Sequence, residues 1–115
     1  MSLGLKTCIG KRSHLRDGSG LRFELENGLS NDTAESGFAI AFQGKVYAYE
    51  NRCPHLGVEL DWAPGVFFDS AQEYLVCSTH GAHFEPDSGK CVSGPCTGQS
   101  LTALAVFEEE GELFT

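Results

Sequence analysis

Residues 46–55 read VYAYENRCPH, an apolar and aromatic run that ends in a cysteine and a histidine one residue apart. Residues 46–49 have the β-branched and aromatic composition of a strand, and residues 38–42 have the same character. Between them, residues 43–45 (Gln-Gly-Lys) are typical of the tight turn of a hairpin. The sequence therefore predicts a β-hairpin that is followed, within a few residues of its second strand, by Cys53 and His55, two side chains of types that can bind metal.

Strand signals continue on both sides of this hairpin. Residues 21–26 alternate apolar and charged side chains, as a half-buried strand does. Further strands are expected at 74–77, 101–107 and 112–114, with a turn at 86–89. Residues 29–36 allow one helical turn, and no stretch sustains the 3.6-residue period of a longer helix. We therefore expect an all-β fold, a small antiparallel sandwich or barrel, in a single domain of residues 1–115.

The composition limits the partners and the cellular location that we expect for this protein. The 115 residues include 16 acidic and 8 basic side chains, a formal charge of −8. Nucleic acid and anionic membranes would repel such a chain, so we expect neither as a partner. The longest apolar run, residues 38–42, is too short for a membrane span or a signal peptide. We therefore expect a cytoplasmic protein, and a monomer.

Two segments combine cysteine and histidine, each just after an expected strand. Cys53-Pro54-His55 follows residues 46–49, and Cys77-Ser78-Thr79-His80 follows residues 74–76. The chain has five cysteines, an odd number, and in a reducing cytosol cysteines serve more often as metal ligands, reactive thiols or small core residues than as disulfides. Because strand ends hold loop side chains on a rigid scaffold, these four residues are candidate metal ligands.

The ligand types leave zinc and an iron–sulfur cluster open. Two thiolates and two imidazoles suit either. Zinc sites usually separate paired ligands by two to four residues, and Cys53-Pro54-His55 has one intervening residue. That spacing is easier to accommodate when the cysteine and the histidine of each loop reach different metal atoms.

The two segments resemble the ligand loops of the Rieske 2Fe–2S family, in which histidines replace two cysteines on one iron. Residues 51–58 are similar to the first loop and residues 77–84 to the second, and the likeness extends over residues 38–115. Residues 85–90 resemble the hairpin that follows, and a proline loop at about 93–97 contains Gly94-Pro95. The resemblance implies that Cys53 and Cys77 bind the inner iron, and His55 and His80 the outer one.

The resemblance also implies a low reduction potential. High-potential members carry an extra cysteine in each loop, where this chain has Val58 and Thr79. They also place a serine and a tyrosine as hydrogen-bond donors to sulfur, where this chain has Ala82 and Phe84. We expect a potential nearer to about −150 mV than to about +300 mV, the ends of the Rieske range.

Several residues stand outside the four ligands. Cys8, Cys91 and Cys96 are left over. The last two flank the proline loop and are expected as small buried side chains, with one of them lining the cluster pocket as the alternative. We expect His83 at the surface or rim, and Trp62 and the phenylalanines in packing. The 21 residues between His55 and Cys77 exceed the family's usual spacing, and the extra length is expected as a surface excursion at 68–72. Residues 108–110 (Glu-Glu-Glu) are expected as a solvated turn, with a docking role as the alternative.

The resemblance implies a one-electron carrier and not an enzyme, a ferredoxin component of an oxygenase-type or related redox system. Its partners would be a reductase and a terminal oxygenase or another acceptor, and the acidic body would dock to a basic patch. One alternative is a small Rieske-like subunit of a nitrite-reductase-type enzyme. An alternative of a different class is a non-redox module in which the same four residues bind zinc.

Overall fold

The computed structural model describes residues 8–24, 36–54, 59–61, 66–77, 81–94 and 97–115, and its regular structure is nearly all strand. No segment among these residues is a helix long and apolar enough to span a membrane. The elements are β1 (Cys8–Lys11), the 3-10 turn η1 (Arg12–His14), β2 (Gly20–Glu24), β3 (Ser36–Phe42), β4 (Lys45–Glu50), β5 (Leu75–Val76), β6 (His83–Phe84), β7 (Cys91–Ser93), β8 (Ala103–Leu104), β9 (Phe107–Glu109) and β10 (Glu112–Phe114).

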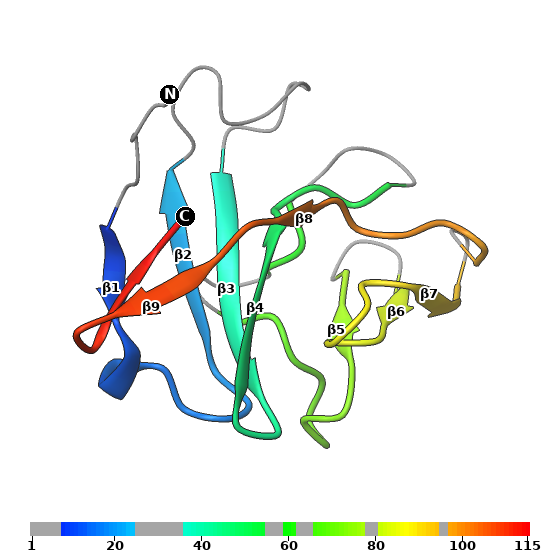
Figure 1. Cartoon of the computed structure of the whole chain (residues 1–115). Helices are drawn as coiled ribbons and strands as arrows, with labels where there is room; N and C mark the ends of the chain where they lie inside the picture. Colours follow the sequence, from blue (N-terminus) through cyan, green and yellow to red (C-terminus); the bar gives the residue numbers. More distant parts are fainter. Residues whose placement is uncertain (1–7, 25–35, 55–58, 62–65, 78–80, 95–96) are drawn as a thin grey trace.

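The strands form three small sheets, and every pairing between named strands is antiparallel. Their orders are β1-β10-β9, β2-β3-β4-β8 and β5-β6-β7. Figure 1 shows the first sheet at one end of the molecule and the third at the other, with the four-stranded sheet between them. The expected all-β antiparallel fold is confirmed.

Strand β3 lies between two cores. Its first six residues are all buried, so neither of its faces meets solvent. Phe38 and Ile40 belong to a core shared with the β5-β6-β7 sheet, whereas Ala39 and Ala41 belong to a second core with Leu113 of β10. Because successive strand side chains point to opposite faces, one apolar strand supplies both cores.

The hairpin from β3 to β4 has the expected turn. Gln43 (φ 52°) and Gly44 (φ 80°) both adopt positive φ, as the two-residue turn that matches strand twist requires. The two strands stay in register from Phe42 opposite Lys45 to Gly37 opposite Glu50. This places the end of β4 beside the start of β3, at the point where the chain enters residues 51–58.

The single strand expected at 101–107 is wrong. The chain instead forms β8, which pairs with β4, and then β9, which pairs with β10 in another sheet. It crosses between two sheets at residues 105–106, so one continuous strand cannot satisfy both partners. The strands β1, β6 and β7 were not expected; β6 and β7 are too short to carry a period-two pattern. The turn expected at 29–36 lies outside the described residues, except for Ser36, which begins β3.

The long segment between the two ligand loops is anchored to the core. The Phe67 ring is 1% exposed and stacks on the Phe38 ring at a centroid distance of 4.0 Å. The Asp69 carboxylate accepts hydrogen bonds from the backbone N–H groups of Glu73 (3.0 Å) and Tyr74 (3.3 Å). The excursion expected at 68–72 is therefore exposed at residues 70–72, while Phe68 remains buried.

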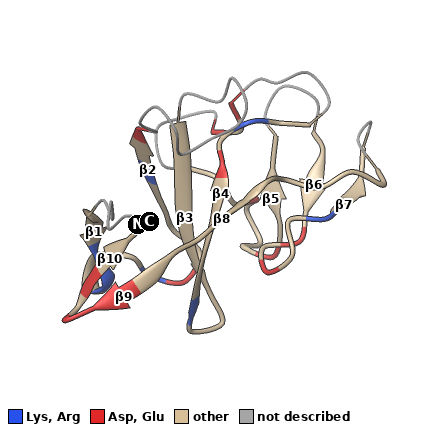
Figure 2. Ribbon diagram, turned by 45° about the horizontal axis from the view of Figure 1, so that its top comes forward, with Lys and Arg blue, Asp and Glu red and all other residues tan. Residues whose placement is uncertain are grey.

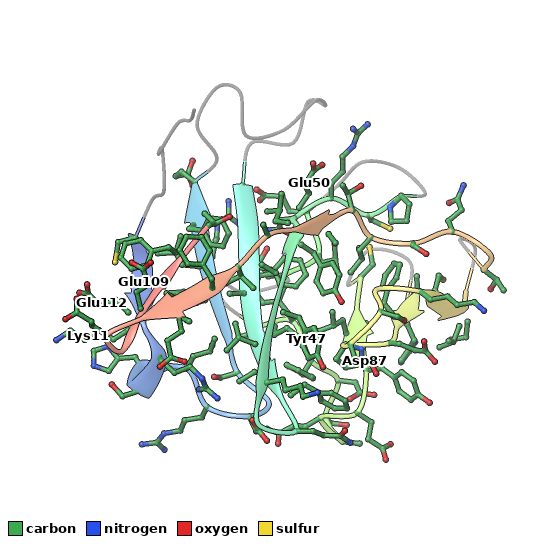
Figure 3. All side chains as sticks on the ribbon, viewed as in Figure 1. Lys11, Tyr47, Glu50, Asp87, Glu109 and Glu112 are labelled. Carbon is green, nitrogen blue, oxygen red and sulfur yellow. The ribbon has the colours of Figure 1, made fainter. Side chains whose placement is uncertain are left out.

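The acidic run 108–110 is exposed, as expected, but only Glu110 lies in the turn between β9 and β10, because Glu108 and Glu109 are paired residues of β9. Figure 2 shows these acidic residues at the end of the molecule opposite β5, β6 and β7. Lys11 and Glu112 face each other across β1 and β10, and Figure 3 shows them with Glu109 on this side of the molecule. The acidic hairpin therefore lies far from the strand ends that lead into the expected ligand loops.

Candidate metal centre

Cys53 and Cys77 both lie in the interior, and the structure brings them into one core. Each is 0% exposed, and both belong to the core cluster that also contains Ala82 and Phe84. Cys53 lies three residues after the end of β4, and Cys77 immediately follows β5. Placement of the two thiols at strand ends is confirmed.

The second loop is closed at its base by backbone hydrogen bonds. The Cys77 N–H donates to the Ala82 carbonyl at 2.9 Å, and the Gly81 N–H donates to the Cys77 carbonyl at 2.8 Å. Just below, Leu75 pairs with Phe84 across the β5–β6 hairpin. Because Cys77 both donates and accepts at this closure, its backbone position is set by the hairpin.

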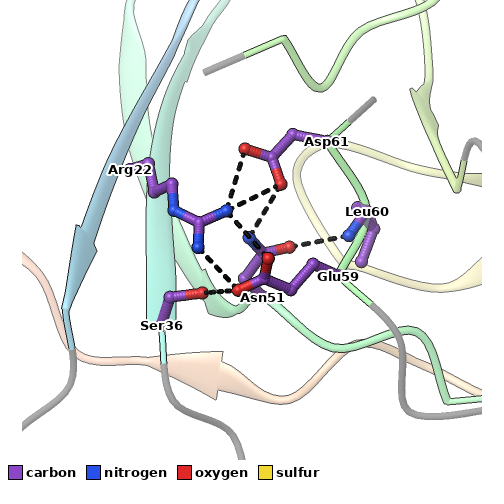
Figure 4. A network of polar contacts seen from close by, with 6 residues as sticks. All are labelled: Arg22, Ser36, Asn51, Glu59, Leu60 and Asp61. Atoms are coloured by element: carbon purple, nitrogen blue, oxygen red, sulfur yellow. Dashed lines mark hydrogen bonds and ion pairs between the residues drawn. The ribbon is translucent and has the colours of Figure 1, made fainter. Parts of the chain in front are cut away.

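The first loop is closed instead by a side chain. The Asn51 carboxamide oxygen accepts the Leu60 N–H at 2.8 Å, and the Asn51 backbone N–H donates to the Ser36 carbonyl at 2.8 Å. Asn51 and Leu60 are 2% and 0% exposed. Figure 4 shows this hydrogen bond within a larger polar network that reaches strand β2. A buried amide thus joins the two ends of the segment that contains Cys53 and His55.

The two histidines of the expected ligand set, His55 and His80, lie outside the described residues. Consistent with this, the described residues contain no group of three or more His, Cys, Asp or Glu side chains able to hold a metal ion. The environment of the described pair fits an iron–sulfur group, because two thiols from two loops are fully buried in one core that excludes water.

The surroundings of the two thiols are apolar. Ala82 and Phe84, which stand where high-potential relatives have hydroxyl donors, are both 0% exposed. Gly94 packs directly on Ala82: a Cβ added to Gly94 would lie 2.8 Å from the Ala82 Cα. The segment expected as a proline loop therefore begins against the second ligand loop, although Pro95 itself lies outside the described residues.

Tyr49 joins the central sheet to the hairpin that follows the second loop. Its hydroxyl donates to the Pro86 carbonyl at 2.8 Å, and its ring packs against Gly89. Burial raises the pKa of the Tyr49 hydroxyl, and the Asp87 charge and Tyr47 add to the effect. The turn expected at 86–89 is confirmed, and Tyr49 holds it against β4.

The remaining candidate residues have varied positions. Cys91 is buried in the same core as the two thiols, as expected, whereas Cys8 is exposed on β1. His83 is half-buried at the rim, and its Nδ1 lies 2.8 Å from the Gly81 carbonyl oxygen. Cys96 and Trp62 lie outside the described residues. Packing is confirmed for four buried phenylalanines, namely Phe38, Phe67, Phe68 and Phe84, and for the partly buried Phe23 and Phe42, whereas Phe107 is exposed.

Sequence reasoning missed the polar residues that support the first loop. Arg22 was assigned only to the charged face of a strand, Asn51 only to the first ligand loop, and Glu59 and Asp61 received no role. The one available signal was an asparagine two residues before Cys53, since asparagine side chains often close loops by bonding to backbone.

Comparison with known proteins identifies the family. The family model of the Rieske [2Fe-2S] domain matches residues 7–109. The comparison with curated proteins gave no match.

Several solved structures share the fold. The ferredoxin of carbazole 1,9a-dioxygenase from Nocardioides aromaticivorans IC177 has a TM-score of 0.74 at 19% identity, over 96% of each chain. A chain in a complex of reduced oxygenase and oxidised ferredoxin in carbazole 1,9a-dioxygenase has a TM-score of 0.73 at 23% identity, over 96% of this chain and 91% of that one. The terminal oxygenase of carbazole 1,9a-dioxygenase from Novosphingobium sp. KA1 also matches, with a TM-score of 0.73 at 22% identity, over 95% of this chain and 28% of that one. The family model covers most of the chain, and the chain therefore belongs to the Rieske [2Fe-2S] domain family.

Proposed function

We propose that this protein is a one-electron carrier whose 2Fe–2S cluster is held by Cys53, His55, Cys77 and His80. The observation that carries the proposal is the presence of two fully buried cysteines, from two separate loops, in one core of a Rieske domain. When bound, such a cluster accepts and releases a single electron. Cys53 and Cys77 would hold the inner iron, and the two histidines would hold the outer one.

The chain's own residues would give the cluster a rigid environment that excludes water, and Ala82 and Phe84 would donate no side-chain hydrogen bond to its sulfur atoms. Both loops are closed at their bases by hydrogen bonds, which limits rearrangement when the charge of the site changes. Ala82 and Phe84 exclude water and offer no side-chain donor to sulfur. Because hydrogen bonds to sulfur stabilise the reduced state, the lack of a donor group on the Ala82 and Phe84 side chains favours a potential near the low end of the Rieske range.

We further propose that the protein is the ferredoxin component of an oxygenase-type or related redox system, not itself an enzyme. The proposal is supported by the similarity of this chain to a ferredoxin over 96% of both chains. The partners would be a reductase and a terminal oxygenase or another acceptor, and one similar structure is a complex of oxygenase and ferredoxin.

Docking would rely on the overall charge of the protein, which is −8. Opposite charges speed association and allow rapid release, which suits a carrier that must exchange partners. The run 108–110 is a poor docking point for electron transfer, because it lies at the end opposite β5, β6 and β7. Transfer rates should fall as ionic strength rises, and rates independent of salt would argue against charge-guided docking.

The same proposal includes a cytoplasmic location, a single domain spanning residues 1–115 and a monomeric state. A compact set of three sheets around two adjoining cores supports one folding unit. Sedimentation of the purified protein tests the monomer, and fractionation of the source cells tests the compartment.

The test of the function is the identity of the bound metal. Iron and zinc are assayed together in the purified protein, and the reduced protein is examined by electron paramagnetic resonance. We expect two irons per chain and a Rieske-type spectrum that changes in the His55→Cys and His80→Cys variants. Stoichiometric zinc in a colourless protein would refute the electron-carrier function, and unchanged spectra in the variants would remove the histidines from the ligand set.

A further inference from the structure

Arg22, on strand β2, reaches across to the segment that follows the first ligand loop. Its two terminal nitrogens donate to the two Glu59 carboxylate oxygens at 3.0 and 2.7 Å, a bidentate arrangement. One of these nitrogens also lies 3.2 and 3.3 Å from the two Asp61 carboxylate oxygens. Paired guanidinium–carboxylate contacts of this kind combine strength with a defined geometry.

The network continues from these carboxylates to the start of the loop (Figure 4). The Asn51 side-chain nitrogen donates to Asp61 Oδ1 at 3.0 Å, and the Ser36 hydroxyl donates to Glu59 Oε2 at 2.8 Å. Asn51 is the residue whose carboxamide oxygen also accepts the Leu60 N–H. A continuous series of polar contacts thus runs from the central sheet to a residue two positions before Cys53.

Burial makes the Arg22–Asp61 contact more consequential than a surface ion pair, whereas the Glu59 side chain is 45% exposed. The Asp61 side chain is 1% exposed, and that of Arg22 is 31% exposed. A carboxylate so removed from water requires hydrogen bonds and a nearby cation, since losing one partner leaves a buried charge uncompensated. The pKa of Arg22 is raised, chiefly by its hydrogen bond to Glu59 and against the effect of desolvation, so Arg22 remains a cation at any working pH.

The two ends of the loop are therefore held both to each other and to the sheet. Residue 51 is fixed by the Ser36 backbone, and residues 59–61 are fixed by Arg22 and Asn51. The second loop needs no such device, because its closure is part of a hairpin. The first loop, residues 51–58, and the segment 59–61 that follows it have no strand pair among the described residues.

We propose that Arg22 is a positioning residue for the iron–sulfur cluster: through Glu59, Asp61 and Asn51 it clamps the first ligand loop onto the central sheet. This inference rests on the proposed function, because it requires Cys53 and His55 to hold the cluster. The clamp also places one cation and two carboxylates at the base of that loop, so it influences the potential as well as the geometry.

The test uses the cluster-loaded protein and four variants. Arg22→Gln removes both the positive charge and the bidentate hydrogen bonding to Glu59. Arg22→Lys retains the charge but not the bidentate geometry. Asp61→Asn neutralises the buried carboxylate. Arg16→Gln is the matched control, because Arg16 is exposed and its loss changes the net charge equally. The rate of loss of visible absorbance to a ferrous chelator, the reduction potential and the electron paramagnetic resonance spectrum are measured for each.

We expect the cluster of Arg22→Gln to be lost roughly tenfold faster than that of the wild type, the scale seen when partners of metal ligands are removed. Arg22→Lys should recover part of that loss, and Arg16→Gln should behave as the wild type. The potential should fall in Arg22→Gln and rise in Asp61→Asn, because the charge changes have opposite signs, whereas cluster loss should accelerate in both.

Each other outcome overturns a specific statement. A coloured wild type with equal loss rates in Arg22→Gln and Arg16→Gln refutes the clamp and leaves the proposed function intact. A wild type that contains zinc and no iron refutes the proposed function itself. Lower thermal stability in Arg22→Gln with an unchanged potential and spectrum would show a general structural role and also refutes positioning. Arg22→Lys and Asp61→Asn provide the same readouts if Arg22→Gln does not fold.

Discussion

Replacement of Gly94 by alanine tests whether the segment after β7 supports the second ligand loop. Gly94 has a φ of +99°, and an added Cβ would lie 2.8 Å from the Ala82 Cα and 3.2 Å from the Ala82 Cβ. Because the nearest atom belongs to backbone, the clash cannot be relieved by turning a side chain. Either Gly94 or Ala82 must move, and Ala82 accepts the Cys77 N–H.

Gly98 provides a matched control for the backbone strain. Its φ is +95°, and an added Cβ would meet nothing within 4 Å. Alanine at either position introduces a similar strain, which lowers the free energy of unfolding by about 2 kcal/mol. The close approach to Ala82 adds about 1–3 kcal/mol for overpacking at Gly94 alone. For a domain of this size that difference corresponds to roughly 4–12 °C in Tm.

The assay combines stability with cluster retention. Urea unfolding followed by circular dichroism measures the free energy of unfolding of wild type, Gly94→Ala and Gly98→Ala. Visible absorbance in the same samples reports the cluster. We expect both variants to be destabilised, Gly94→Ala by more, and only Gly94→Ala to lose its cluster faster. Adding Ala82→Gly to Gly94→Ala should restore only part of the loss, because it removes the methyl group of residue 82 while the backbone of that residue still crowds the new side chain.

Two results would refute this reasoning. Equal decreases in the free energy of unfolding of Gly94→Ala and Gly98→Ala would mean that the close approach to Ala82 does not contribute to stability. A larger loss in Gly94→Ala with unchanged cluster retention would separate this packing from the second ligand loop.

Three further predictions concern the same core. Tyr49→Phe removes the buried hydrogen bond to Pro86, so the free energy of unfolding in urea should fall by about 1–3 kcal/mol, against little change for Tyr74→Phe at the surface. Because burial raises the pKa of Tyr49 above its ordinary 10.0, the unfolded chain releases that proton first. The free energy of unfolding should therefore be constant with respect to this group below pH 10 and decrease above it, less steeply in Tyr49→Phe, as a pH series at constant salt would show. Voltammetry should give a negative midpoint for the wild type and a higher one for Ala82→Ser, where a hydroxyl donor is introduced; a positive wild-type midpoint would contradict the apolar-surround argument.

Short-range patterns of apolar and turn residues were sufficient to predict most of the strands. The hairpin from β3 to β4 is readable because its two apolar runs are long and its turn contains a glycine at positive φ. The same patterns failed at residues 101–107, where the apolar side chains are continuous but the hydrogen-bonding partners change from β4 to β10. Which strand a segment pairs with depends on distant residues, so no window of sequence contains it.

The two cores were likewise invisible in the sequence. Residues 38–42 read as one apolar strand, and the alternation of large and small side chains along it gave no reason to expect two separate interiors. In the structure Phe38 and Ile40 face the core that contains Cys53 and Cys77, while Ala39 and Ala41 face the core that contains Leu113 of β10. The small residues on that face allow the β1-β10-β9 sheet to pack closely.

The sequence by itself determined the chemistry expected of the candidate centre: two Cys/His pairs just after strands, with Ala82 and Phe84 where high-potential members of the family have hydroxyl donors. That information is local, because ligand type and spacing are properties of short segments. Only the tertiary structure decided how the loops are held. Arg22 is 37 positions from Glu59 and 39 positions from Asp61 in the sequence. Gly94 packs on Ala82 because β6 and β7, which lie next to these two residues, are paired. Such interactions depend on sheet register and on the path of the chain between sheets, which short segments do not encode.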